Sequence, residues 1–398
     1  MAKRVLLVNK FYYPRGGDCV VMMNTEALLR SNGYEVAVFA MHHPETSPSE
    51  WSSYFASEVS FSGGMSAKIS GMKRTLGMGD IKAAFCKILD DFKPDVVHLH
   101  NIHSYLSPVL AELAHSRGTR VVWTLHDYKL LCPAYTCTRD KKPCEKCFNG
   151  KCGVVKHRCM KGSLAASVIA WMEAKKWNRK KLESCTDAYI CPSQFMAKKM
   201  AKGKFTPEKL QVICNFVDPE KLQRLKETDG TQRGNYYCYV GRLSEEKGVR
   251  TLLKAAATLP YELRVAGDGP LEEELRQQYA GHQNIKFLGK LNAEEVAKLL
   301  SEAQFSIMPS ECYENNPLGV IESLCAGTPV IGAEIGGIPE LIDPASGLTY
   351  PSGTAEVLAI AIEGSMKREW NHAAIKEESI ERFSPETHLK KLTELYGF

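Results

Sequence analysis

Short apolar runs rich in β-branched residues alternate with longer segments of helical periodicity along almost the whole chain. Runs of this kind predict buried strands, and the periodic segments between them predict helices. The rhythm restarts near residue 236. Because parallel strands need crossover helices that cover both faces of a sheet, the pattern predicts two doubly wound α/β sheets. The predicted strands are residues 4–9, 35–39, 96–100, 120–125, 188–191 and 211–214, followed by 237–240, 262–266, 285–288, 305–308, 329–331 and 348–350.

The length agrees with two domains. The chain has 398 residues, which is more than a single hydrophobic core usually organises. A polar stretch at residues 218–235 contains two glycines and is typical of a linker, so we place the boundary there. We expect one Rossmann-like domain over residues 1–217 and a second over residues 218–380.

The composition is that of an ordinary packed globular protein, with 44% hydrophobic and 24% charged residues. The longest nearly apolar stretch, residues 164–172, is far shorter than the roughly 20 residues that a membrane helix needs. Residues 1–8 lack the apolar core and the cleavage site of a signal peptide. We therefore expect a cytoplasmic protein without a membrane span.

A glycine pair follows the first predicted strand. Gly16 and Gly17 would let backbone N–H groups approach an anion at the start of the next helix, and a plain tight turn explains them equally well. The chain has neither Gly-x-Gly-x-x-Gly nor Gly-x-x-x-x-Gly-Lys-Ser/Thr at this position, so the sequence does not favour a dinucleotide or P-loop site.

Two basic residues follow the first strand of the second half. Lys247 is predicted in a first helical turn, where a cation is unfavourable by a few tenths to about 1 kcal/mol unless an anion lies nearby. Glu245 and Glu246 could supply that anion within a solvated charge cluster. Arg242, however, stands at the strand end, so a bound diphosphate explains the placement of both cations, and we favour this interpretation.

The stretch at residues 310–322 carries two carboxylates and a helix start. Pro317 suits the first helical position and leaves the N–H groups of Leu318 and its neighbours open to an anion or a sugar oxygen. Glu314 precedes the helix and Glu322 lies within it, so both could face one pocket and hold pairs of sugar hydroxyls. Two surface glutamates are the alternative, which suits Glu322 less well on a partly apolar helix.

A histidine after a predicted strand is a candidate catalytic residue, and a common metal-binding motif is absent. His126 follows the strand predicted at residues 120–125, where a structural and a catalytic role remain equally open. No two Asp are separated by a single residue. The Asp-x-Asp signature by which one large class of sugar transferases holds Mn²⁺ is therefore absent, and we expect catalysis without a metal.

Together these segments resemble a glycosyltransferase of family 4, a retaining enzyme of GT-B fold, over essentially the full length of the chain. Each motif is weak alone, and their order along the chain is specific. The resemblance implies two Rossmann-like domains that face a central cleft, with residues 381–398 forming a helix that crosses back to the first domain. The motifs are residues 14–17, 98–101, 124–127, 240–243, 246–248 and 267–270, and Glu314 with Glu322 at the spacing Glu-x7-Glu.

The resemblance also implies an activity. The chain would transfer a sugar from a nucleotide-diphosphate sugar, bound by the second domain, to a hydroxyl of a glycan or lipid-linked acceptor, bound by the first, in bacterial surface polysaccharide biosynthesis. Arg242 and Lys247 would neutralise the diphosphate, and Glu322 would hold the ribose. The implied catalytic residues are His126, Glu314, Arg242 and Lys247, and the implied donor-binding residues are Gly16, Gly17, Gly241, Arg242, Lys247, Asn316, Pro317, Leu318 and Glu322.

Two other classes of protein share this fold. A non-catalytic scaffold or regulatory protein that binds nucleotide sugars is the main alternative, although the complete set of charged motif residues favours an enzyme. An epimerase or a phosphorylase is the other, and no lysine context for pyridoxal is found.

Six of the 14 cysteines lie within residues 132–159. In a cytosolic chain this density favours a metal or a reduced thiol cluster over disulfides. The segment resembles an insert found in a subset of bacterial surface-polysaccharide transferases. A structural Zn²⁺ held by Cys132, Cys144, Cys147 and Cys159 is one interpretation, and disulfides or free thiols are the others.

The positive charge of the chain is local. Residues 139–204 carry 17 Lys and Arg against 5 Asp and Glu. A helix predicted at residues 163–184 places Trp171 and Trp177 beside lysines, which suits an anionic membrane surface; a solvated helix that covers the first sheet is the alternative. Nucleic acid is not an expected partner, because interleaved stacking aromatics and a known binding motif are lacking.

Overall fold

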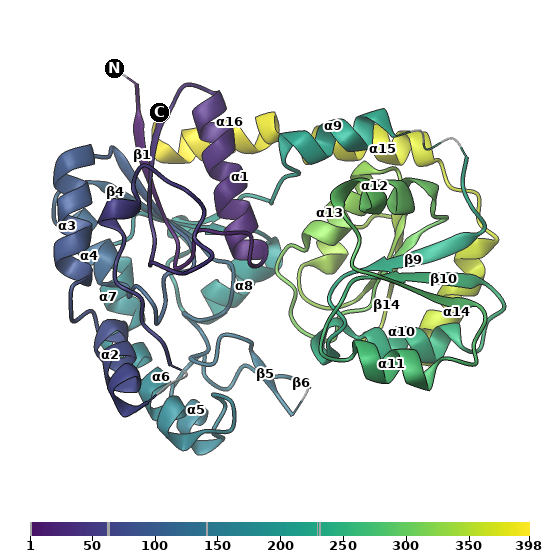
Figure 1. The fold of residues 1–398 in the computed structure, drawn as a ribbon, viewed down its shortest axis with the longest axis horizontal. Helices are drawn as coiled ribbons and strands as arrows, with labels where there is room; N and C mark the ends of the chain where they lie inside the picture. Colours follow the sequence, from purple (N-terminus) through teal and green to yellow (C-terminus); the bar gives the residue numbers. More distant parts are fainter. Residues whose placement is uncertain (1, 62–63, 141, 229, 231) are drawn as a thin grey trace. The chain divides into compact units, whose positions relative to one another are not determined.

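A computed structural model of the chain describes residues 2–61, 64–140, 142–228, 230 and 232–398. The chain divides into two compact units, each built around its own sheet (Figure 1). The first unit comprises residues 1–139, 144–213 and 389–398, and the second comprises residues 140–143 and 214–388.

The first unit contains a six-stranded parallel sheet in the order β2-β1-β3-β4-β7-β8. All six strands predicted for this half are present. The order reverses direction at β1, which lies between β2 and β3, and ligands of such sheets bind at the carboxyl ends of the strands beside this switch point. The strands of this sheet are β1 (Arg4–Val8), β2 (Glu35–Phe39), β3 (Val96–Leu99), β4 (Arg120–Thr124), β7 (Ala188–Cys191) and β8 (Leu210–Val212). Two short strands lie in the cysteine-rich segment, β5 (Thr138–Arg139) of the first unit and β6 (Lys142–Pro143) of the second.

Helices join these strands and cover the sheet, as parallel connections require (Figure 1). The final helix, α16 (Pro385–Tyr396), contributes its residues from Leu389 onward to the first unit. The other helices before β8 are α1 (Gly17–Ser31), α2 (Met65–Thr75), α3 (Ile81–Phe92), α4 (Val109–His115), α5 (Gly153–Lys156), α6 (Leu164–Lys176), α7 (Arg179–Glu183) and α8 (Gln194–Lys202).

The second unit repeats the architecture with the order β11-β10-β9-β12-β13-β14, and here the switch point lies beside β9. Alternate residues of β9 enter two different cores, with Tyr237 and Tyr239 in one and Tyr236 and Cys238 in the other. This alternation follows from the two-residue period of a strand that is buried on both faces. The strands are β9 (Tyr236–Val240), β10 (Glu262–Ala266), β11 (Ile285–Gly289), β12 (Ser306–Met308), β13 (Val330–Ala333) and β14 (Gly347–Tyr350), and the helices are α9 (Pro219–Glu227), α10 (Val249–Ala256), α11 (Glu272–Gln278), α12 (Ala293–Glu302), α13 (Leu318–Cys325), α14 (Ala355–Met366) and α15 (His372–Arg382).

The stretch predicted as a poorly packed linker, residues 218–235, contains a helix instead. The Asp218 carboxylate caps α9 by accepting a hydrogen bond from the N–H of Lys221 at 2.9 Å, and Leu222 and Leu225 are buried. Two buried leucines in a polar segment give too weak a pattern to mark the helix. Asp229 and Thr231 of this stretch lie outside the described residues.

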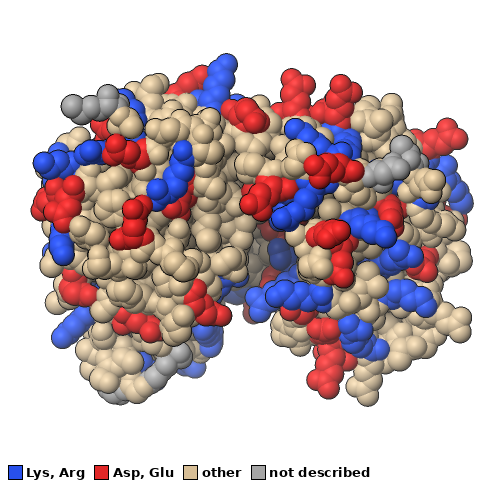
Figure 2. Space-filling model, turned by 45° about the horizontal axis from the view of Figure 1, so that its top comes forward, with Lys and Arg blue, Asp and Glu red and all other residues tan. Residues whose placement is uncertain are grey.

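The segment predicted as one helix over residues 163–184 is two helices, α6 and α7. Asn178 separates them, and its side chain accepts a hydrogen bond from the N–H of Lys181 at 3.3 Å, which caps α7. Within the described parts of the chain, no helix has both the length and the apolar character needed to cross a membrane. Acidic and basic side chains are interspersed on the face drawn in Figure 2.

Candidate functional site

The loop after β9 supplies the first cation of the candidate site. Arg242 follows Gly241 directly at the carboxyl end of this strand, and its side chain is exposed. Its guanidinium makes no ion pair or hydrogen bond with any other described residue. Five N–H donors at the sheet's switch point are therefore available to a ligand anion, as the sequence predicts.

Lys247 supplies the second cation and lies beside Glu314. Its Nζ is 2.6 Å from Glu314 Oε1, which also accepts a hydrogen bond from Ser310 Oγ at 2.9 Å. Burial disfavours the charged ammonium, but the attraction of Glu314 outweighs this and raises the pKa of Lys247. The lysine is thus fully charged near neutral pH, and of its three N–H donors one is engaged by Glu314.

The structure joins two residues that the sequence predicts separately. The anion beside Lys247 is Glu314, from the loop between β12 and α13, whereas Glu245 pairs with Arg250 at 2.9 Å. The local charge cluster suggested by Glu245 and Glu246 therefore does not supply the main partner of Lys247.

Two glycines fix the backbone of Glu314. Gly337 N donates a hydrogen bond to the Glu314 carbonyl at 2.8 Å, and Gly336 has φ = +64°. A Cβ at Gly336 would lie 2.1 Å from the Glu314 carbonyl oxygen, so only glycine fits. These glycines were not predicted. Adjacent glycines after β13 are a weak signal without knowledge of what approaches them.

The N-terminus of α13 lies in the same loop. Pro317 is the residue before the helix, which begins at Leu318, one position later than predicted. Pro317 O accepts from the N–H groups of Val320 and Ile321, while those of Leu318 and Gly319 donate no hydrogen bond to another described residue. These two N–H groups are the ones predicted to meet an anion or a sugar oxygen.

Asn316, the residue before Pro317, is buried and held by another loop of the second unit. Its side-chain oxygen accepts a hydrogen bond from the N–H of Asn215 at 2.9 Å, and its carbonyl accepts one from Asn215 Nδ2 at the same distance. Asn316 therefore fixes the backbone that leads into α13.

Glu322 lies in the second turn of α13 and pairs with a lysine of the helix that replaces the predicted linker. Glu322 Oε1 is 2.5 Å from Lys221 Nζ, and the carboxylate side chain is 17% exposed. Oε2 keeps its acceptor capacity for a ligand hydroxyl. No hydrogen bond or ion pair joins Glu322 to Glu314 in the described residues, so the expected common pocket of these two carboxylates stays a prediction.

In the first unit, a polar cluster gathers after β1, β3 and β4. Lys10 Nζ lies 3.5 Å from Asp18 Oδ2, in the first turn of α1, and Asn101 Nδ2 donates to Asp127 Oδ2 at 3.3 Å. Burial raises the pKa of the Asp18 carboxyl, but Lys10, His126 and a hydrogen bond from Asn101 together lower it below its usual value. The sequence did not single out Lys10 or Asp18.

Gly16 and Gly17 border this cluster. Gly16 caps α1 with an extended backbone that any residue could adopt, and a Cβ at Gly17 would meet nothing within 4 Å. Backbone conformation therefore does not require glycine at either position. Both residues are exposed, which leaves room for close approach by a ligand.

His126 ends a chain of histidines on this sheet. Its Nε2 lies 2.9 Å from His100 Nδ1, and burial is the largest of the effects that lower the pKa of His126 to about 4. His98, whose ring is tilted against that of His100, hydrogen-bonds to Tyr396 at 2.6 Å and to Thr124 at 2.7 Å. His126 is thus held as a neutral imidazole.

The cysteine-rich segment brings Cys132, Cys147 and Cys159 of the predicted set near one another, together with Cys137, which was not predicted. Hydrogen bonds from Cys137 and Cys147 to Cys132 lower the pKa of Cys132. None of the 14 cysteines forms a disulfide, and the described residues contain no group of three or more His, Cys, Asp or Glu arranged to hold a metal. Zinc at Cys132, Cys144, Cys147 and Cys159 therefore stays a hypothesis.

The prediction that Trp177 faces a membrane surface is wrong. Its side chain is buried, and Nε1 donates to the carbonyl of Thr75 at the end of α2 at 3.0 Å. Lys176 and Lys181 lie over its ring, and Lys181 also pairs with Glu112 at 2.8 Å. Trp177, between the end of α6 and the start of α7, therefore packs against the rest of the first unit. The basic residues around it in the sequence do not reveal this burial.

Two family models match the chain. Residues 15–221 match "Glycosyltransferase Family 4", and residues 223–382 match "Glycosyl transferases group 1". Together the two matches extend over both units.

Curated relatives include the amylovoran biosynthesis glycosyltransferase AmsK of Erwinia amylovora, 32% identical over 38% of this chain and 40% of AmsK. The sulfoquinovosyl transferase SQD2 of Arabidopsis thaliana is 29% identical over 44% of this chain and 36% of SQD2. The chain thus aligns with less than half the length of either protein. An uncharacterized 42.6 kDa protein in the cps region of Klebsiella pneumoniae is 26% identical over 85% of this chain and 87% of its own length.

Solved structures share the fold over nearly the whole chain. HepE of Anabaena, determined with UDP and glucose, superposes with a TM-score of 0.62 at 16% identity and covers 99% of both chains. The lipopolysaccharide outer core galactosyltransferase WaaB superposes with a TM-score of 0.67 at 15% identity and covers 98% of both chains. These likenesses establish the arrangement of elements in the chain.

Replacing Gly336 by alanine is expected to lower the melting temperature more than the same change at Gly353. Both glycines have positive φ, +64° and +79°, so both variants carry the left-handed strain of about 1 kcal/mol. Only Gly336→Ala adds a clash with the Glu314 backbone, because a Cβ at Gly353 would meet only Glu311 Cδ, at an ordinary contact distance of 4.0 Å. Equal losses of melting temperature in the two variants would show that Gly336 does not hold Glu314.

His126 is expected to titrate near pH 4. The folded-state pKa lies below the unfolded value of about 6.5, so the stability linked to the neutral imidazole is complete above pH 6.5 and is lost as the pH falls through 4. NMR of the imidazole resonance that disappears in His126→Gln measures this directly. A midpoint near 6.5 would contradict the assignment of a buried, neutral ring.

Proposed function

The chain belongs to glycosyltransferase family 4 and has the GT-B fold that its sequence predicts, and from this membership we propose that it is a retaining, metal-independent glycosyltransferase. It moves a sugar from a nucleotide-diphosphate sugar to a hydroxyl of a glycan or lipid-linked acceptor. Relatives named for amylovoran biosynthesis and as an O-antigen chain mannosyltransferase support a place in bacterial surface polysaccharide biosynthesis.

The observation that carries this proposal is the pair of cations after β9. Arg242 is exposed and unengaged by other described residues, and Lys247 is held charged by Glu314 at 2.6 Å. A departing nucleotide diphosphate gains negative charge, and fixed cations with their positions already set stabilise it without reorganisation. Arg242 and Lys247 thus take the place that a metal ion holds in other sugar transferases.

The carboxylates then hold hydroxyl groups of the donor. Glu322 Oε1 is oriented by Lys221, which leaves Oε2 to accept hydrogen bonds from the ribose. Glu314 holds hydroxyls of the transferred sugar, next to the lysine that binds its leaving group. HepE has been determined in complex with UDP-glucose, which supports a nucleotide sugar as the donor class.

His126 holds a hydroxyl of the sugar through the ring nitrogen that His100 does not engage. A neutral imidazole adds no positive charge, so it positions the sugar without competing with Arg242 and Lys247 for the diphosphate. In the transfer, the bond from the sugar's anomeric carbon to the diphosphate oxygen breaks, and the acceptor oxygen bonds to that carbon on the same face. The acceptor proton passes to the departing phosphate.

The proposal includes peripheral contact with an anionic membrane surface on the inner face of the cell membrane. Trp177 is buried and does not support this contact. The contact is supported by the excess of Lys and Arg in residues 139–204, several of which are exposed. A lipid-linked acceptor would bring the chain to that surface.

Arg242→Ala and Lys247→Ala are each expected to reduce kcat/KM for sugar transfer roughly 30- to 1000-fold, which corresponds to about 2–4 kcal/mol of lost transition-state stabilisation. The donor is first identified by a thermal-shift panel of nucleotide sugars, since a ligand at 100 times its dissociation constant adds about 2.7 kcal/mol to stability.

Arg250→Ala is the matched control for these variants. It removes a cation of the same segment that pairs with Glu245 and Glu274 instead of facing the site. Its kcat/KM should stay within about twofold of the unsubstituted protein, because exposed ion pairs contribute little. Near-normal transfer by Arg242→Ala or Lys247→Ala would refute the assignment of these cations.

A further inference from the structure

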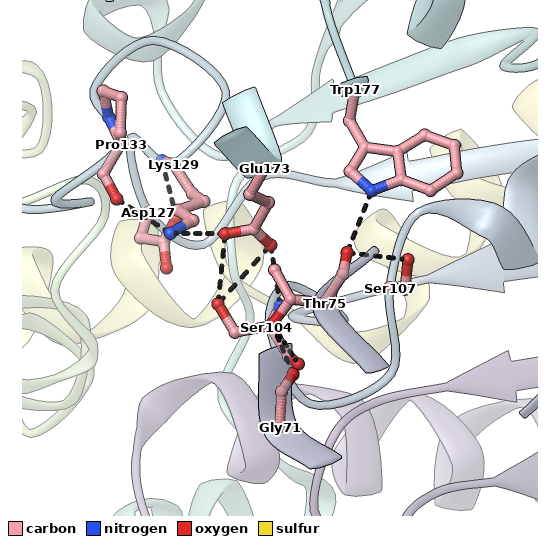
Figure 3. Close-up of polar contacts among 9 residues, drawn as sticks. All are labelled: Gly71, Thr75, Ser104, Ser107, Asp127, Lys129, Pro133, Glu173 and Trp177. Carbon is pink, nitrogen blue, oxygen red and sulfur yellow. Dashed lines mark hydrogen bonds and ion pairs between the residues drawn. The ribbon is translucent and has the colours of Figure 1, made fainter. Parts of the chain in front are cut away.

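The first unit contains a cavity of about 320 Å³ that the proposed donor site does not use. It lies between the loop after β4, the end of α6, the segment 148–152 of the cysteine-rich insert and residues 203–205 after α8. None of the residues assigned to the donor, and not His126, lines it. Figure 3 shows part of its lining, where Lys129, Glu173 and Trp177 lie among their polar partners.

The charge of the lining is strongly positive, with one carboxylate among five cationic side chains. That carboxylate, Glu173, is already satisfied, because it pairs with Lys129 at 2.9 Å and accepts hydrogen bonds from the N–H and hydroxyl of Ser104 (Figure 3). It cannot neutralise the rest of the cavity. The five cationic residues are Lys129, Lys151, Lys175, Arg179 and Lys204.

Three of these lysines form no ion pair with a described acidic residue. Lys151 donates to the carbonyls of Leu130 and Leu131 at 3.1 and 2.5 Å, and burial lowers its pKa more than the nearby thiols of Cys147, Cys132 and Cys137 raise it. Lys175 and Lys204 are exposed at the cavity. A partly buried ammonium without a carboxylate is costly, and a concave surface of one sign focuses its field, so the cavity favours an anion.

The remaining lining suits the body of a sugar. His103 stacks on Trp123 with ring centroids 5.2 Å apart, and burial, reinforced by Lys129 and Lys10, lowers its pKa well below the usual value. A neutral imidazole can exchange hydrogen bonds with a hydroxyl. The ring of Trp177 adds an apolar surface, so the cavity combines a few polar groups with aromatic walls, as small-molecule sites do.

We propose that this cavity binds an oxyanion carried on a sugar, a carboxylate or a phosphate, and that it is a subsite for an acidic acceptor. Lys151, Lys175 and Lys204 face the anionic group, and His103 faces a hydroxyl of the same sugar. The role as an acceptor subsite rests on the proposed function, whereas the anion site itself does not.

Isothermal titration with glucuronate, glucose 1-phosphate and neutral glucose tests this. In the double variant Lys175→Gln/Lys204→Gln, binding of the anionic probe is expected to weaken about tenfold or more. The matched control is Lys180→Gln/Lys198→Gln, which removes the same charge from exposed positions of α7 and α8 that do not line the cavity. It should bind within about twofold of the unsubstituted protein.

Arg242→Ala separates this proposal from the proposed function. Anion binding that persists in Arg242→Ala and weakens in Lys175→Gln/Lys204→Gln places the probe in the cavity, even if Arg242→Ala has lost sugar transfer. Anion binding lost in Arg242→Ala and retained in Lys175→Gln/Lys204→Gln places the probe in the donor site and overturns the proposal, while the proposed function stands.

The probes also identify the anion. Glucuronate bound without glucose 1-phosphate indicates a carboxylate, and the reverse indicates a phosphate. Equal affinity for neutral glucose, an equal loss in the control pair, or no binding of either anion with a dissociation constant below about 10 mM would overturn the proposal.

Discussion

The ion pair between Lys247 and Glu314 joins the loops that follow β9 and β12, two strands that neighbour each other in the second sheet. It needs both loops to approach closely, and glycines make this possible: Gly336 faces the backbone of Glu314, and Gly248 faces that of Pro309. The pair raises the pKa of Lys247 and so keeps this partly buried lysine charged. The proposed binding of the donor by Arg242 and Glu322 depends on this ion pair, because it holds together the two loops next to these residues.

The parallel sheets explain why these residues meet. Carboxyl ends of parallel strands lie at one edge, so loops far apart in sequence gather beside the switch point. In the first unit the same rule assembles Lys10, Asp18 and His126 after β1 and β4. Each unit therefore presents a polar cluster of its own, which is cationic after β9 and contains the neutral imidazole of His126 after β4.

The sequence predicts the strands well, because burial on both faces of a sheet leaves continuous apolar runs. All 12 strands of the two six-stranded sheets appear within a few residues of their predicted bounds. It also predicts correctly that Arg242 and Lys247 follow a strand of the second sheet, while their role in binding stays a proposal. Contacts over long sequence separations, such as Lys221 with Glu322, leave no local pattern and were missed. The burial of Trp177 and the helix α9 were missed for the same reason, since tertiary packing decides both.

A crystal structure of the protein with its intact nucleotide-sugar donor tests the central claim most directly. The account predicts diphosphate oxygens at charge-assisted hydrogen-bond distance, about 2.7–2.9 Å, from Lys247 Nζ and from the Arg242 guanidinium. It also predicts a ribose hydroxyl on the Glu322 carboxylate. A donor whose phosphates lie away from the carboxyl ends of β9 and β12, with both cations turned to solvent, would contradict it.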